Sequence, residues 1–485
     1  MAYEAVIGLE CHIQLSTRTK MFCACPVGFG AAANTHVCPV CLGLPGALPV
    51  VNRAAIDAAV RLGLALGCDV RGSSVFARKN YFYPDMPKNY QITQYDQPLC
   101  VGGALTIVID GAERSFELTR IHAEEDTGKS SHPERLHDRR VSRVDFNRAG
   151  VPLLELVTEP RFHDPDECAV FLAALRRLVR WLGISDADME KGHLRCDANV
   201  SLRPRGESRL GVKTELKNLN SIKGVGKGIT AEIARQTRLL EAGDRVEQTT
   251  LLYDADHDRL VVMRSKESAH DYRYFPEPDL PVLAVSPAWV EDARSRLPEL
   301  PWVREERLIA EHGLPVYDAA VLTEQREASD YFEAVAARVD AKLASNWVMT
   351  EVLRVLRERG WSFADWNAKV PPERLAGLLT RVASRELPGP LAKQAFGWLP
   401  DEEGDVATLL ERHGVRVRSS ADDLLPLVLA VIDENPGPVE QVLAGRTQTF
   451  GFLVGQVMKK SGGQAVPQTV QELLRAELAK RGQAP

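Results

Sequence analysis

A glutamate and a histidine near the start of the chain lie two residues apart in a segment that alternates like a strand. Between residues 6 and 15, apolar side chains alternate with polar ones, so Glu10 and His12 point to the same side of the predicted strand. A carboxylate beside an imidazole can bind a divalent ion or transfer protons. The segment therefore predicts a site of chemistry on one face of a sheet.

Four cysteines follow this segment in two short pairs. They are Cys23, Cys25, Cys38 and Cys41. Structural zinc takes four soft ligands in a tetrahedron, which two close pairs on two turns can supply. The alternative is four unrelated reduced thiols, but the spacing favours zinc, with His36 as a spare candidate ligand. Because four thiolates leave the ion no open position, we predict a structural site.

Acidic residues in three later segments could complete a site for a hard metal ion. Glu124 and Glu125 belong to a run of three acids, Glu155 lies in an apolar segment, and Asp197 lies on the polar face of an alternating strand. An unpaired carboxylate in apolar surroundings is costly, so these acids need a cation. Magnesium prefers oxygen ligands and could gather several of them. The alternative, which spacing alone favours, is separate pairing with nearby arginines, namely Arg120, Arg143, Arg148 and Arg195.

A lysine-rich segment precedes and enters a predicted helix. Its candidate phosphate-binding residues are Lys213, Lys217, Lys223 and Lys227. Helix N-termini attract phosphates. The segment does not match the nucleotide-binding loop, because the first glycine is missing and Gly228 replaces the Ser or Thr that would hold magnesium. Phosphate binding and a solvated charged loop both remain open.

Aromatic residues occur beside cationic ones in residues 78–90 and again in residues 271–275. Exposed rings next to Lys and Arg could stack on unpaired bases. The alternative, which is commoner in a mixed domain, is that the rings belong to a core.

Bulk composition indicates a globular protein of more than one domain. The chain has 485 residues, is 45% hydrophobic and 26% charged, and carries a formal net charge of −6, so any contact with RNA must come from a local patch. We find no signal peptide and no apolar stretch that would span a bilayer, and we expect a cytoplasmic protein with no membrane partner. Nine cysteines are then expected to be reduced rather than paired in disulfides.

The pattern along the chain predicts an α+β fold in three parts. Residues 1–290 mix strand and helix signals, including a helix that begins at Asp164 and one near residues 228–242. Six prolines between residues 275 and 302 indicate a boundary near 290. Residues 291–405 and 406–485 are predicted to be helical, separated by the polar segment 399–405.

Six long runs of this sequence resemble one family, the B subunits of the aspartyl/glutamyl-tRNA amidotransferases. The runs are residues 3–15, 76–90, 121–129, 145–155, 213–221 and 264–275, and the resemblance continues at lower density through residues 450–459. It covers essentially the whole chain. It implies a cradle-shaped catalytic domain, a helical domain, and a helical tail that binds tRNA.

The resemblance also implies a function in a three-subunit enzyme. An amidase A subunit frees ammonia from glutamine, and a small C subunit wraps the A–B interface. Mischarged tRNA, either glutamate on a glutamine tRNA or aspartate on an asparagine tRNA, is bound by the B subunit. The same subunit activates the side-chain carboxylate with ATP before ammonia displaces phosphate. The missing amidase nucleophile in this sequence agrees with ammonia made by a partner.

Site roles follow from the resemblance residue by residue. Glu10, His12, Glu124 and Glu125 match the family's metal-binding positions, so Mg²⁺ becomes the favoured interpretation, with Glu10, His12 and Glu125 as the predicted ligands. The predicted catalytic set is Glu10, His12, Glu124, Glu125 and Glu155. Glu190 and Asp197 are weaker matches to the family and stay outside this set. Zinc at the four cysteines would then stabilise the fold. The rival hypotheses are a tRNA-binding scaffold without ATP chemistry and a stand-alone metal hydrolase.

Overall fold

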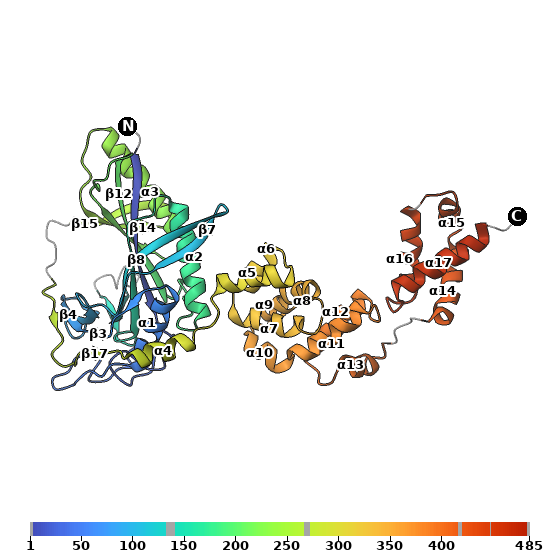
Figure 1. Ribbon diagram of the computed structural model, residues 1–485, viewed down its shortest axis with the longest axis horizontal. Coiled ribbons are helices and arrows are strands. Elements are labelled where there is room, and N and C mark those ends of the chain that lie inside the picture. The colour runs from blue at the N-terminus through green and yellow to red at the C-terminus, as the bar shows by residue number, and fades with distance from the viewer. Residues whose placement is uncertain (1–2, 132–140, 266–271, 416–419, 447, 483–485) are drawn as a thin grey trace. The chain divides into compact units, whose positions relative to one another are not determined.

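The computed structural model describes the whole chain except residues 1–2, 132–140, 266–271, 416–419, 447 and 483–485. The chain forms two compact units, Met1–Leu300 and Pro301–Pro485. The first unit combines a large mixed sheet with helices and the second is helical, so the predicted α+β class is confirmed (Figure 1). Among the residues that the structure describes, no helix combines the length and apolar composition that crossing a membrane requires.

A ten-stranded sheet forms the framework of the first unit. In spatial order its strands are β15 (Arg259–Ser265), β14 (Thr249–Asp254), β13 (Thr214–Leu219), β12 (Leu194–Pro204), β1 (Tyr3–Gln14), β11 (Pro152–Thr158), β8 (Ala112–Glu125), β6 (Cys100–Val101) and β2 (Asp69–Val70), and β7 (Ala104–Ile109) also pairs with β8. The central strands β12, β1, β11 and β8 pair with one another in antiparallel fashion. As predicted, β1 and β12 bury their apolar sides, including Leu9, Cys11 and Ile13.

Three helices, α1 (Arg53–Ala65), α2 (Pro165–Trp181) and α3 (Ile222–Glu241), pack against this sheet. Helix α2 begins where predicted, since the Asp164 side chain accepts a hydrogen bond from the Asp166 amide at 2.7 Å. Helix α3 begins six residues earlier than residue 228, because the Ser221 hydroxyl caps it by accepting from the Gly224 amide at 3.0 Å. Gly228 of this helix packs closely against Leu219, since a Cβ on Gly228 would lie 2.8 Å from the Leu219 side chain.

Smaller sheets complete the first unit. One contains β16 (Phe275–Pro276), β4 (Phe76–Asn80) and β5 (Tyr90–Gln94), and two others pair β17 (Leu283–Ala284) with β3 (Ser73–Ser74) and β10 (Arg143–Asp145) with β9 (Lys129–Ser131). Strand β5 packs against β8.

The boundary near residue 290 moves to Leu300, because helix α4 (Pro287–Ser295) packs on α1. Asp57 of α1 accepts hydrogen bonds from Trp289 Nε1 at 3.2 Å and from Arg296 Nη2 at 2.8 Å. These contacts tie the proline-rich segment to the first unit.

The second unit contains two separate hydrophobic cores. Helices α5 (Pro301–His312), α6 (Val316–Leu322), α7 (Arg326–Ala336), α8 (Ala341–Trp347), π-helix η1 (Val348–Val352), α9 (Leu353–Arg359), α10 (Phe363–Lys369), α11 (Pro372–Ala383), α12 (Gly389–Trp398) and α13 (Val406–Arg412) contribute to the first. Helices α14 (Ala421–Glu434), α15 (Pro436–Leu443), α16 (Gln448–Lys460) and α17 (Pro467–Gly482) form the second.

The predicted division at residue 405 is too early by one helix. Val406, Leu409 and Leu410 of α13 are buried in the first of these cores, together with residues from α5 to α12. The polar segment before α13 is therefore a turn within one helical core. The second core begins only at Leu424.

Candidate functional site

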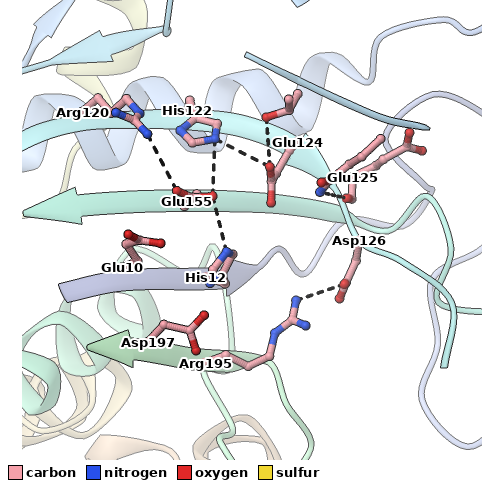
Figure 2. A network of polar contacts seen from close by, with 12 residues as sticks. Glu10, His12, Arg120, His122, Glu124, Glu125, Asp126, Glu155, Arg195 and Asp197 are labelled. Carbon is pink, nitrogen blue, oxygen red and sulfur yellow. Dashed lines mark hydrogen bonds and ion pairs between the residues drawn. The ribbon is translucent and has the colours of Figure 1, made fainter. Parts of the chain in front are cut away.

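The strand register brings three polar side chains into a row across the middle of the sheet. His12 of β1 pairs with Glu155 of β11, and Glu155 pairs with His122 of β8. Side chains at paired positions lie on the same face, so the three converge (Figure 2). The Nε2 atoms of His12 and His122 lie 3.4 Å and 3.6 Å from Glu155 Oε2.

Glu124 completes this group, which we call the acid–histidine cluster: His12, His122, Glu124 and Glu155. Glu124 lies two residues after His122 on the same face of β8, and its Oε2 is 3.6 Å from His122 Nε2. From β5, the Thr93 hydroxyl donates a 2.9 Å hydrogen bond to the same oxygen. His12, Glu124 and Glu155 can each place one ligand atom within 4.8 Å of the others.

The cluster fits a divalent cation by charge as well as by donor type. Burial opposes ionisation of Glu155, but the imidazoles of His122 and His12 outweigh it and hold the pKa of Glu155 well below its ordinary value. Burial also opposes ionisation of Glu124, but His122 and Lys79 outweigh it and hold the pKa of Glu124 below its ordinary value. Two ionised carboxylates thus share a buried space, and their oxygens suit magnesium or manganese, while the imidazole of His12 also suits transition metals.

Glu10 lies on the same face of β1 as His12, but its carboxylate is not among the atoms that gather there. Its Oε1 accepts a 2.9 Å hydrogen bond from Asn199 Nδ2 of β12. Its register partner Asp197 pairs with Lys217 Nζ at 2.7 Å. Glu10 and Asp197 therefore border the cluster, while Glu190 is exposed and does not line the cavity beside the cluster.

Glu125 is separated from His12, contrary to the predicted magnesium ligand set. As the neighbour of Glu124 on a strand, it projects to the opposite side. Its Oε1 accepts a 2.9 Å hydrogen bond from the Ile92 amide and forms an ion pair with Lys88. Glu125 thus holds β5 and Lys88 in place beside the site.

Cations line a cavity of about 410 Å³ that opens onto the cluster. Lys79, Arg195 and Lys217 contribute to its wall. Arg195 Nη2 lies 3.0 Å from Asp126 Oδ1, so this carboxylate fixes the guanidinium, and the positive charge of Lys79 acts on Glu124 and Glu155. This cavity, the acid pocket, combines a candidate metal site with groups that suit phosphate.

The side-chain contacts bear on the alternatives that the sequence left open. Arginine pairing holds for Asp126, whereas Glu124 and Glu155 face imidazoles, with Arg120 Nη2 only 4.0 Å from Glu155 Oε1. Of the four lysines predicted to meet phosphate, Lys217 lines the acid pocket. The others are exposed outside its lining: Lys213, Lys223 and Lys227.

His122 and Lys79 are the site residues that sequence reasoning missed. Alternation within residues 120–126 would have placed His122 on the face of Glu124. Lys79 carried no comparable pattern, because its position depends on the packing of β4 beside the sheet.

The four predicted zinc ligands also come together. Sulfur atoms of Cys23, Cys25, Cys38 and Cys41 all lie within 4.8 Å of one another, an arrangement that could hold a metal ion. The Nζ of buried Lys20 lies 3.5 Å from Cys41 Sγ and donates to the carbonyls of His36 and Phe146 at 2.7 and 3.2 Å. A buried ammonium beside a thiolate group offsets part of its negative charge. The donor set fits tetrahedral zinc.

Comparison with known proteins addresses the family directly. Residues 5–291 match the model described as the GatB/GatE catalytic domain, and residues 330–478 match the GatB domain. Curated proteins named as the B subunit of aspartyl/glutamyl-tRNA(Asn/Gln) amidotransferase are similar over their full length. Those of Chlorobium chlorochromatii and Moorella thermoacetica are each 48% identical, across 99% of this chain and 100% of theirs. That of Solidesulfovibrio magneticus is 47% identical, across 98% and 99%. This chain belongs to the family of aspartyl/glutamyl-tRNA amidotransferase B subunits.

The resemblance predicted from the six runs is thus confirmed. The match to the amidotransferase family's catalytic domain spans the large sheet and every residue of the acid–histidine cluster. The cluster therefore lies in the part of the chain that this family uses for catalysis.

Proposed function

We propose that this chain is the activating subunit of a glutamine-dependent tRNA amidotransferase. In this proposal it phosphorylates the side-chain carboxylate of Glu-tRNA(Gln), Asp-tRNA(Asn) or both with ATP. Ammonia then displaces phosphate to give the amide. The observation that carries the proposal is the acid–histidine cluster beside the cationic wall of the acid pocket, inside a chain of this family.

A carboxylate reacts poorly with ammonia, because the reaction would have to expel oxide. Phosphorylation supplies a leaving group, and phosphoryl transfer depends mainly on positioning and charge neutralisation. His12, Glu124 and Glu155 would hold Mg²⁺, which when bound would neutralise charge on the triphosphate. Glu10 would remain at the border of this site, positioned by Asn199.

The chain's own cations would act on the transferred group. Lys79 of β4 and Arg195 of β12 both line the acid pocket. Asp126 orients Arg195, and His122 holds Glu124 and Glu155 at fixed separation by contacting both carboxylates. No covalent nucleophile from the chain is required in this scheme, since the substrate carboxylate attacks ATP directly.

The same proposal gives roles to the partner subunits, the helical unit and the four cysteines. Ammonia would come from an amidase A subunit, with a small C subunit completing a heterotrimer. The helical unit after residue 300, and above all its last core, would bind the body of the tRNA. The four cysteines would hold a structural zinc ion that stabilises the segment carrying Lys20.

A reconstitution tests this proposal. The full chain is combined with its amidase and small subunits, glutamine, ATP and each mischarged tRNA, and the amide product is measured. We expect Glu155→Gln to lower amide formation at least 100-fold while tRNA binding persists. Glu113→Gln, which alters an exposed carboxylate on the same strand β8, serves as the matched control and should stay near wild type.

Product formation by Glu155→Gln at the wild-type rate would contradict the proposed site. Turnover of a simple phosphate ester without tRNA would instead favour a metal hydrolase. A wild-type complex that binds tRNA but makes no amide would indicate a scaffold.

A further inference from the structure

Two aromatic segments that are far apart in the sequence lie side by side next to the acid pocket. Phe275 pairs with Arg78 in the β16–β4 register. The Asn80 amide donates a 3.0 Å hydrogen bond to the Tyr272 carbonyl, and its side chain donates to the Arg273 carbonyl at 2.9 Å. The fold therefore joins residues 78–83 and 272–275 into one surface.

This surface lines a second cavity, the aromatic pocket, with a volume of about 910 Å³. Tyr81 and Tyr272 meet edge to face with ring centroids 6.3 Å apart. Phe82, Tyr83 and Phe275 are 82%, 56% and 44% exposed, so they are not core residues. Contiguous exposed aromatic groups on a protein surface are typical of interaction sites.

The aromatic pocket adjoins the acid pocket. Four residues line both cavities: Lys79, Tyr81, Lys217 and Met263. Lys79 Nζ lies 5.2 Å from the centroid of the Tyr272 ring, so a cation sits where the two pockets meet. A ligand with a flat base at one end and a group to be phosphorylated at the other would span both.

We propose that the aromatic pocket seats the unpaired 3′-terminal nucleotides of the aminoacyl-tRNA. Stacking on exposed rings is the usual way proteins hold unpaired bases, and lysines beside the rings suit the phosphate backbone. The ribose of the terminal nucleotide carries the amino acid, so seating it here would direct the side-chain carboxylate toward Glu124 and Glu155. This inference rests on the proposed function and assigns the substrate end to a particular surface.

The adenine of ATP is the alternative occupant with the same chemistry, and the openness of the surface favours the tRNA end. Phe82 and Tyr83 are exposed to solvent, so the 3′ end of a tRNA bound outside the pocket can reach them. The volume of about 910 Å³ lies within the range of roughly 300–1,000 Å³ for small-ligand pockets and accommodates either occupant, so the exposure of the rings carries the choice.

The test uses the assembled complex and a tRNA whose terminal adenosine is replaced by 2-aminopurine, a base whose fluorescence falls on stacking. We expect quenching with the wild-type complex in the absence of ATP. Phe82→Ala with Tyr83→Ala should abolish the quenching and raise KM for aminoacyl-tRNA about tenfold, with KM for ATP unchanged. Phe82→Trp should retain both properties, since it keeps a stacking surface.

Phe29→Ala is the matched control, because Phe29 is 70% exposed but does not line the aromatic pocket. A rise in KM for ATP with unaltered tRNA binding would overturn the proposal and assign the pocket to the nucleotide. Unchanged quenching and unchanged KM values in the double variant would overturn it as well. Because quenching is read without ATP, it separates the two claims: a wild-type complex that quenches but forms no amide would refute only the proposed function.

Discussion

His12 on the first strand and Glu155 on β11 face one another with Nε2 and Oε2 3.4 Å apart. This contact follows from the pairing of β1 with β11 and is held by the same register over five residue pairs. It joins the start of the chain to the middle of the catalytic unit. Any shift of one residue would turn one of the two side chains to the opposite face of the sheet.

Lys79 is expected to contribute more to catalysis than the exposed lysines of the segment 213–227. Lys79→Met removes a cation from the wall of the acid pocket and should lower kcat by about 100-fold. Lys213→Met, which removes an exposed charge outside the pocket, should leave kcat near wild type. Steady-state amidation kinetics of both variants measure the difference. Equal losses would restore the sequence-based phosphate assignment.

The cysteine group is expected to bind one zinc ion per chain. Cys41→Ser removes a ligand, so metal analysis of the purified variant should find little zinc, and its melting temperature should fall below that of wild type. Cys68→Ser is the control, since this buried cysteine lies outside the group. Full zinc content in Cys41→Ser would rule out the four-thiolate site.

The stability that the contact between α1 and α4 contributes is expected to fall at acidic pH. Partial burial opposes ionisation of Asp57, but Arg296, Trp289 and Arg61 together hold its pKa below the ordinary value. A carboxyl with a lowered folded-state pKa stabilises the fold above its unfolded pKa, and this contribution disappears as pH falls through the folded value.

Asp57→Asn should therefore reduce the free energy of unfolding by about 1–2 kcal/mol at pH 7 and by much less near pH 3. Urea unfolding at the two pH values measures both. Asp69→Asn is the control, because Asp69 and its partner Arg71 are both largely exposed, and it should change stability by less than about 0.5 kcal/mol. A cost for Asp57→Asn that persists unchanged near pH 3 would contradict this assignment.

Truncation distinguishes the two positions for the tail boundary. A chain ending at residue 415 keeps Leu409 and Leu410 in their core, whereas one ending at 405 loses them and should unfold with at least about 2 kcal/mol less free energy. Both truncations remove the last core and should weaken tRNA binding strongly. Equal stability of the two chains would return the boundary to 405, and undiminished tRNA affinity would refute the role of the tail.

The local elements of the site could be predicted from the sequence because they depend on local periodicity and spacing. Alternation placed Glu10 and His12 on one face of β1, and the spacing of the cysteine pairs predicted their convergence. The same rule, applied to β8, separates Glu124 from Glu125 and adds His122. Assigning Glu125 to the ion by resemblance alone overlooked this alternation.

Long-range packing set the remaining features, and no local pattern encodes it. Lys79 reaches the acid pocket because the small β16–β4–β5 sheet lies beside the large one. The division between the two helical cores depends on which core buries α13, a contact with helices far earlier in the chain. The start of α3 differs from the predicted one because Ser221 caps the helix ahead of glycines that are typical of loops, and one of them, Gly228, lies against Leu219.

The position of a bound metal ion tests the central claim most directly. Crystals of the complex grown with Mn²⁺ and a non-hydrolysable ATP analogue would locate the ion by its anomalous scattering. We predict a peak about 2.0–2.3 Å from His12 Nε2 and from carboxylate oxygens of Glu124 and Glu155, with a terminal phosphate of the analogue beside it. Ordered nucleotide elsewhere in the complex, with no peak between these three side chains, would contradict the account.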